Sequence, residues 1–137
     1  MSPAPYRFGL ALGIALFVWM SGFVWGSVVF MVPALKEIPE IPHISKYPAI
    51  SFPLLVVWIV AVIFLARFYL RETPRKASEG LKFGLVLALV NLLLDLLVIV
   101  FAFGGGWSFF SYVSIWVAYI SLVVVPWLTG RRLEAQT

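Results

Sequence analysis

Residues 81–103 read LKFGLVLALVNLLLDLLVIVFAF, and this stretch decides how the rest of the chain is arranged. A helix of this length rises by about 35 Å, which is enough to cross a hydrocarbon core of about 30 Å. Two polar residues, Asn91 and Asp95, lie near its middle. The stretch is therefore predicted to be a membrane-spanning helix that carries an acid in its interior.

The small and polar residues of this helix share one face. In a membrane, small residues let helix backbones approach closely, and polar side chains form hydrogen bonds between helices. This face is therefore predicted to point toward other helices rather than lipid. At about 100° per residue, its members fall within roughly 60° of one another; they are Gly84, Ala88, Asn91, Asp95 and Ala102.

The carboxyl group of Asp95 would lie near the centre of the bilayer, where its charge must be neutralised or paired. An ionised carboxylate at the centre of a bilayer costs at least ~2.5–3.5 kcal/mol, so Asp95 is expected to be protonated or to have a partner. Asn91, one turn earlier, is predicted to donate a hydrogen bond to it. Two interpretations stay open: the pair joins helices structurally, or it forms a site that responds to protons or cations, as intramembrane acids often do.

The composition indicates a membrane protein without an enzyme's active site. Of 137 residues, 63% are hydrophobic and 12% charged, against about 25% charged in soluble domains. There is no cysteine, and the single histidine, His43, lies in a predicted loop. Thiol chemistry, a thiolate metal site and a bis-histidine haem within one chain are therefore excluded. No nucleophile–base pair or phosphate loop is present either, so no enzymatic activity, cofactor or metal site is expected.

Four apolar segments predict the fold. They cover residues 8–32, 50–70, 81–103 and 107–128. We expect an all-α, polytopic membrane protein, with four transmembrane helices in one antiparallel bundle. A Pro-rich polar connection at residues 33–49 separates the first two spans. The three glycines at 104–106 predict a tight reversal, so the third and fourth spans should form an antiparallel hairpin.

The basic residues predict the orientation. Eight of the ten Lys and Arg residues lie in the N-terminus, in the connection between the second and third spans, or in the C-terminus. The other two are Lys36 and Lys46. Cytoplasmic loops carry the excess of positive charge, so both termini are expected to be cytoplasmic, in a multi-pass protein of a prokaryotic inner membrane. The net charge of +4 is accordingly a topology signal, and no nucleic-acid partner is expected.

Aromatic and hydroxyl residues suggest what surrounds Asp95. Three tryptophans lie near the centres of different spans, and each indole N–H needs an acceptor, for which Asp95 is the obvious candidate. Serines on the fourth span form the expected counterface. Packing by large rings is the alternative interpretation; otherwise the site is predicted to bind a cationic or amphipathic small molecule. Its expected members are Asp95, Asn91, Ser111, Ser114, Trp19, Trp58, Trp116 and Tyr112, with Tyr119 beside the serine face.

Two Gly-x-x-x-Gly pairs in the first span suggest a partner. Gly9 and Gly13 lie on one face of the helix, and Gly22 and Gly26 lie on roughly the opposite face. One pair is expected to pack inside the bundle and the other against a second subunit or another membrane protein. Two functions are therefore predicted: a small binding or transport module with a proton- or cation-responsive acid, or an accessory or assembly subunit of a larger membrane complex.

Overall fold

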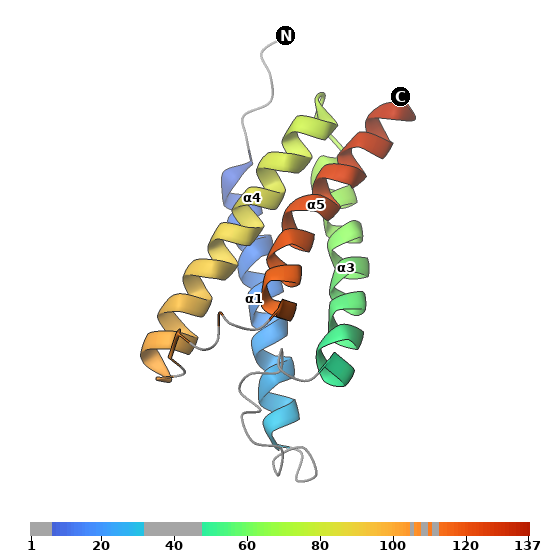
Figure 1. Ribbon diagram of the computed structural model, residues 1–137. Coiled ribbons are helices and arrows are strands. Elements are labelled where there is room, and N and C mark those ends of the chain that lie inside the picture. Colours follow the sequence, from blue (N-terminus) through green and yellow to red (C-terminus); the bar gives the residue numbers. More distant parts are fainter. Residues whose placement is uncertain (1–6, 32–47, 105, 108–109, 111–112) are drawn as a thin grey trace.

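The computed structural model describes residues 7–31, 48–104, 106–107, 110 and 113–137; side chains of residues 25–31, 48–55 and 113–114 lie outside the description. Within these residues the protein is all-helical and contains no strand. The predicted all-α class is thus confirmed. The elements, drawn in Figure 1, are α1 (Phe8–Met31), α3 (Pro48–Leu70), α4 (Lys76–Leu94), its π-helical continuation η2 (Asp95–Ala102), and α5 (Val113–Ala135).

The helices α4 and α5 form the centre of the arrangement. They make the most extensive contact of any two helices, while α1 packs on α4 and α3 packs on α5. The start of α1, the end of α5 and the turn between α3 and α4 lie at one end of the bundle (Figure 1). The third and fourth predicted helices are therefore antiparallel neighbours, as expected from the glycine turn.

Glycines bring the backbones of α4 and α5 into direct contact. A Cβ atom added at Gly84 would lie 2.7 Å from the carbonyl oxygen of Val123, closer than real Cβ atoms come to any atom. Gly80, one turn earlier, meets the carbonyl oxygen of Pro126 in the same way. Gly80 and Gly84 are thus a small-x-x-x-small pair on α4 that serves the internal helix pairing typical of membrane proteins. The face predicted from the sequence included Gly84 but not Gly80.

The ends of α4 and α5 differ from the predicted ones. We expected residues 107–128 to form the last helix, but α5 runs from Val113 to Ala135. Gly130 lies inside it, against the backbone carbonyl of Lys76 at the start of α4. The α4 helix likewise begins before residue 81. Contact between the first turn of α4 and the last turns of α5 stabilises both helices beyond their apolar segments.

The π-helical segment changes which residues face inward after Asp95. In a π-helix the backbone hydrogen bonds join residues five apart, as in the 2.9 Å bond from the amide of Phe103 to the carbonyl of Val98. Ala102, predicted on the inward face, is exposed, and Val100 is buried instead. The predicted face is correct up to Asn91 and wrong at Ala102, because it assumed α-helical spacing throughout.

The glycines of α1 divide into an internal and an open group. A Cβ atom at Gly22 would lie 2.6 Å from the Trp58 ring of α3, so this position packs inside the bundle. At Gly9 and Gly13 an added Cβ would meet nothing within 4 Å. Gly26 falls among the side-chain positions outside the description. The expected partner at the open glycines stays a prediction.

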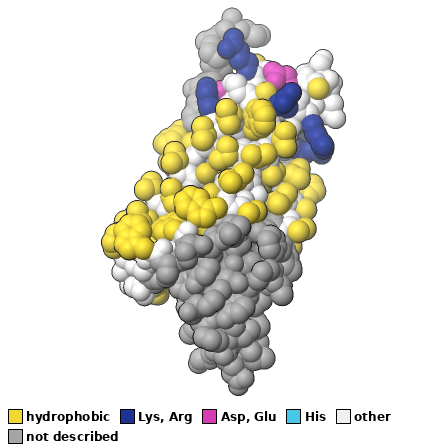
Figure 2. All heavy atoms as spheres, in the orientation of Figure 1, with side chains coloured by type: hydrophobic (Ala, Val, Ile, Leu, Met, Phe, Trp, Pro, Cys, Tyr) yellow, Lys and Arg dark blue, Asp and Glu magenta, His cyan; other side chains and the backbone are white. Residues whose placement is uncertain are grey.

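The outer surface is mostly apolar. Figure 2 shows apolar side chains over the middle of the visible face, and Lys and Arg side chains near the end where α5 finishes. One helix among the described residues, Lys76–Ala102, is long and apolar enough to cross a membrane, and only 17% of its most apolar window is buried. A core helix of a soluble protein would be mostly buried. The described apolar parts of α1 and α3, Phe8–Val24 and Val56–Leu70, are shorter.

Candidate functional site

Asp95 lies where three elements meet. It is the first residue of η2, at the point where the α-helical hydrogen-bond pattern ends. Its Oδ1 atom accepts a hydrogen bond of 2.9 Å from the indole Nε1 of Trp19 on α1. Its Oδ2 atom accepts one from the hydroxyl of Tyr119 on α5. The carboxyl group thus joins α1 and α5 through η2, and we call these three residues the Asp95 cluster.

Asn91 forms a separate attachment one turn away. It is 2% exposed, and its Nδ2 donates 2.8 Å to the carbonyl of Leu87 in its own helix. The same atom lies 3.5 Å from the carbonyl of Ala15, a fully buried residue of α1. The predicted hydrogen bond from Asn91 to Asp95 is therefore wrong: backbone carbonyls occupy the amide donor. Asn91 holds α1 against α4 at the level just before the carboxyl group.

Only one of the three predicted tryptophans contacts Asp95. The indole of Trp116 donates 2.7 Å to the carbonyl of Phe110 and is half exposed. Its ring nevertheless meets the Tyr119 ring edge-on, with centroids 5.9 Å apart. The Nε1 atom of Trp58 is buried and has no hydrogen-bond partner within the part of the chain that the structure describes. Trp19 is therefore the indole donor, and Trp116 positions Tyr119.

Most of the expected serine counterface cannot be compared with the structure. Ser111 and Tyr112 lie outside the described residues, and so does the side chain of Ser114. Ser121, on the same predicted face, donates 2.7 Å to the carbonyl of Val117 in its own helix.

Tyr119 supplies the donor on α5, and the sequence placed it only beside the serines. The sequence pointed to Trp116 because it lies near the centre of the predicted fourth span. Since α5 begins at Val113, six residues later than predicted, Tyr119, one turn after Trp116, reaches Asp95 instead. The signal available in the sequence was a tyrosine one helical turn after Trp116.

Aromatic rings continue outward from the cluster on both sides. Trp19 stacks on Phe23 with centroids 5.2 Å apart, and Phe23 lies 6.0 Å from Phe103 at the end of η2. Beyond Tyr119, the rings of Trp116 and Phe110 follow at 6.3 Å. Neither ion pair found among the described residues, Arg7–Glu72 and Lys82–Glu79, includes Asp95. Among the described residues, two hydrogen-bond donors therefore stabilise this carboxyl group where a basic side chain ordinarily would.

The two donors of the Asp95 cluster respond differently to protonation. An ionised carboxylate accepts at both oxygens, and an indole N–H can only donate, whereas a phenol can donate or accept. Once Oδ2 is protonated, it can donate to the Tyr119 hydroxyl, which must then direct its own hydrogen elsewhere. The bond from Trp19 to Oδ1 is compatible with both states. Gain of a proton therefore reverses the direction of the hydrogen bond between Asp95 and Tyr119. The hydrogen bond from Trp19 on α1 stays in place.

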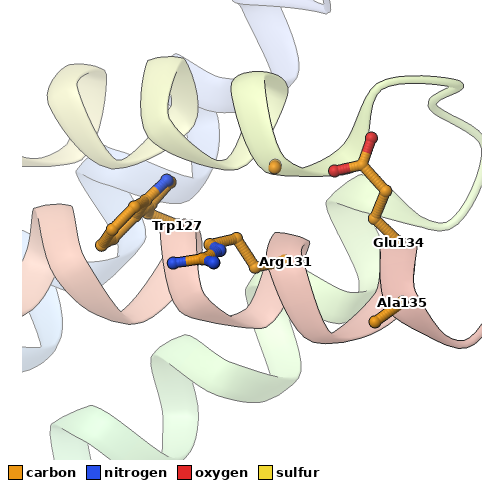
Figure 3. A pocket seen from close by; sticks show the side chains of 5 residues that line it. Trp127, Arg131, Glu134 and Ala135 are labelled. Carbon is orange, nitrogen blue, oxygen red and sulfur yellow. The ribbon is translucent and has the colours of Figure 1, made fainter.

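The two best-defined pockets of the described residues lie away from Asp95. One, of about 400 Å³, lies beside Trp127 and Arg131 near the C-terminus (Figure 3). The other, of about 480 Å³, lies between α3 and α5 at the same end. Neither is the tryptophan-lined pocket around an acid that the sequence suggested.

Comparison with protein-family models, with curated proteins and with solved structures finds no match.

Proposed function

We propose that this chain is a small four-span membrane protein in which Asp95 gains and loses a proton, and that it acts as a proton-responsive binding or transport module. The observation that carries the proposal is the pair of hydrogen bonds from α1 and α5 to one carboxyl group. An acid held in this way, away from basic side chains, couples its protonation state to the contact between helices. The proposal involves no enzymatic step.

Helix length and charge placement support the membrane location. The α1 helix has 24 residues and no charged one, and α3 has 23 residues with Arg67 as its single charge, in the last turn. Helices of this length rise by about 35 Å, which matches the hydrocarbon core. Large apolar side chains on all four helices are exposed, including Phe17, Phe64, Leu97 and Ile120. A lipid environment would cover them.

Reporter fusions test the proposed orientation. A reporter that is active only in the cytoplasm should be active at either terminus, because basic residues are concentrated at that end of the bundle. The same reporter inserted after residue 40, in the connection between α1 and α3, should be inactive. Activity at one terminus but not at the other would contradict a four-span arrangement.

Infrared difference spectroscopy tests the proton-responsive acid. The full chain in lipid is exposed to buffers of falling pH, and the carbonyl-stretch band of a protonated carboxylic acid is followed. We expect a band that titrates in the unchanged protein and is absent in Asp95→Asn, because the amide retains an acceptor and a donor but cannot ionise. Repeating the experiment with rising sodium at constant pH separates proton from cation response.

Glu79→Gln is the matched control for this experiment. Glu79 belongs to the same helix as Asp95 but lies near its charged start, where it pairs with Lys82 at 3.0 Å. Its substitution should leave the Asp95 band unchanged. Identical difference spectra for the unchanged protein and Asp95→Asn would overturn the proposal. For transport, proton entry into vesicles that contain a pH-sensitive dye should be lost in Asp95→Asn and kept in Glu79→Gln.

A second candidate function is an accessory subunit of a larger membrane complex. The observation that favours it is the open surface of α1 at Gly9 and Gly13. In that case the Asp95 cluster would only join helices. The infrared experiment separates the two functions, because a carboxyl group with a purely structural role would show no titrating band in the pH range where the fold is stable.

A further inference from the structure

A groove between α3 and α5 combines arginines with apolar side chains. It lies at the end of the molecule where both helices finish and has a volume of about 480 Å³. Arg67 stands in the last turn of α3 and Arg132 in the last turn of α5, and both line the groove. Ile63, Val125 and Leu128 line it at positions further from the helix ends. The groove therefore combines guanidinium groups near the helix ends with apolar side chains, and Thr129, Leu133 and Ala135 also line it.

The charge of Arg67 and Arg132 is not compensated within the described residues. Both are exposed, and neither makes an ion pair in that part of the chain. By contrast, Arg7 pairs with Glu72 at 2.6 Å. A guanidinium group offers several N–H donors in a planar fork that matches phosphate geometry. Two such guanidinium groups line the same groove.

Arg131 is a third basic residue at this site, but it is partly engaged elsewhere. Its guanidinium carbon lies 5.3 Å from the centre of the Trp127 ring. Figure 3 shows it beside Trp127, in the neighbouring pocket. We therefore assign the groove's anion-binding character to Arg67 and Arg132.

We propose that this groove binds an anionic phospholipid of the leaflet on the side of the termini. The headgroup phosphate would lie between Arg67 and Arg132, and an acyl chain would follow Ile63, Val125 and Leu128. Basic pockets between membrane helices on the cytoplasmic side recognise anionic lipids in this way. The inference rests on the membrane location in the proposed function and is independent of Asp95.

Native mass spectrometry in detergent tests the inference. The full chain is mixed with dioleoylphosphatidylglycerol or dioleoylphosphatidylcholine, and the fraction of protein that carries one lipid is followed. We expect binding of the anionic lipid at concentrations where the zwitterionic lipid is not retained. Arg67→Gln/Arg132→Gln should weaken it by about thirtyfold, since each basic residue near an anionic surface contributes roughly fivefold.

Arg71→Gln/Arg75→Gln is the charge-matched control. Both residues are exposed near the turn between α3 and α4, and neither lines the groove. This variant should bind the anionic lipid as the unchanged protein does. Arg67→Lys/Arg132→Lys should bind at an intermediate level. Circular dichroism and gel filtration of the lipid-free variants verify that each one is folded.

Three results would overturn the inference: equal retention of the two lipids, equal losses in the groove variant and the control, or displacement of the lipid by millimolar inorganic phosphate. The last result would indicate a soluble anion as the ligand. Asp95→Asn should bind the anionic lipid normally. Failure of lipid binding is thereby distinguished from failure of the proposed proton response.

Discussion

Gly84→Leu should leave little folded protein. The atoms that a side chain at this position would meet are backbone atoms of Leu122 and Val123, all within 2.9 Å of the added Cβ. A backbone cannot move aside by changing rotamer, so α4 and α5 would have to separate along their length. Overpacking typically costs about 1–3 kcal/mol, and this site lies at the upper end or beyond it. The free energy of unfolding in mixed micelles measures the effect.

Gly13→Leu provides the control for this prediction. It makes the same chemical change in another apolar helix, where an added Cβ meets nothing within 4 Å. Its unfolding free energy should change little or rise slightly, because leucine is the better helix former by up to ~1 kcal/mol. Gly80→Leu and Gly130→Leu should behave like Gly84→Leu. Equal unfolding free energies for Gly84→Leu and Gly13→Leu would contradict the close packing of the α4 and α5 backbones at Gly84.

Asp95→Leu should destabilise the protein strongly, whereas Asp95→Asn should not. Leucine leaves the indole N–H of Trp19 and the hydroxyl of Tyr119 without their acceptor. Each unsatisfied buried donor costs about 1–3 kcal/mol, so the combined loss is roughly 2–6 kcal/mol. Asparagine keeps an oxygen for Trp19 and an N–H group that can donate to Tyr119. Unfolding free energies of the two variants should therefore differ by at least about 2 kcal/mol.

Removing the donors together with the acid should restore stability. When both partners of a buried hydrogen bond become apolar groups of similar shape, the net effect is small. Asp95→Leu combined with Trp19→Phe and Tyr119→Phe should therefore be more stable than Asp95→Leu alone. Additive losses in the triple variant would mean that the three side chains do not act as one cluster.

The centres of the helices could be predicted from the sequence, and their ends could not. The length of the apolar segments alone located α1, α3 and α4 to within a few residues, because each segment is long enough to form one helix. The start of α4 at Lys76 and the end of α5 at Ala135 depend instead on the contact between Gly130 and the Lys76 backbone. That contact joins residues far apart in the chain, so it cannot be predicted from a local sequence pattern.

The candidate site was predicted in part, for a related reason. Asp95 and Trp19 stood out because a polar group in an apolar segment needs a partner. Tyr119 was placed only beside the site, since its level relative to Asp95 depends on where α5 begins. The π-helical backbone after Asp95 had no signature among the apolar residues of η2, so the outward turn of Ala102 was missed.

The position of the two chain ends has a practical consequence. Arg7 pairs with Glu72 at the turn between α3 and α4, and α5 finishes at that same end. Under the proposed four-span arrangement, two copies can therefore be joined in tandem through a hydrophilic linker, without an additional crossing segment. Such a concatemer would allow one copy to carry a substituted Asp95 while the other stays intact. Gene fusion would then count how many carboxyl groups a working assembly requires.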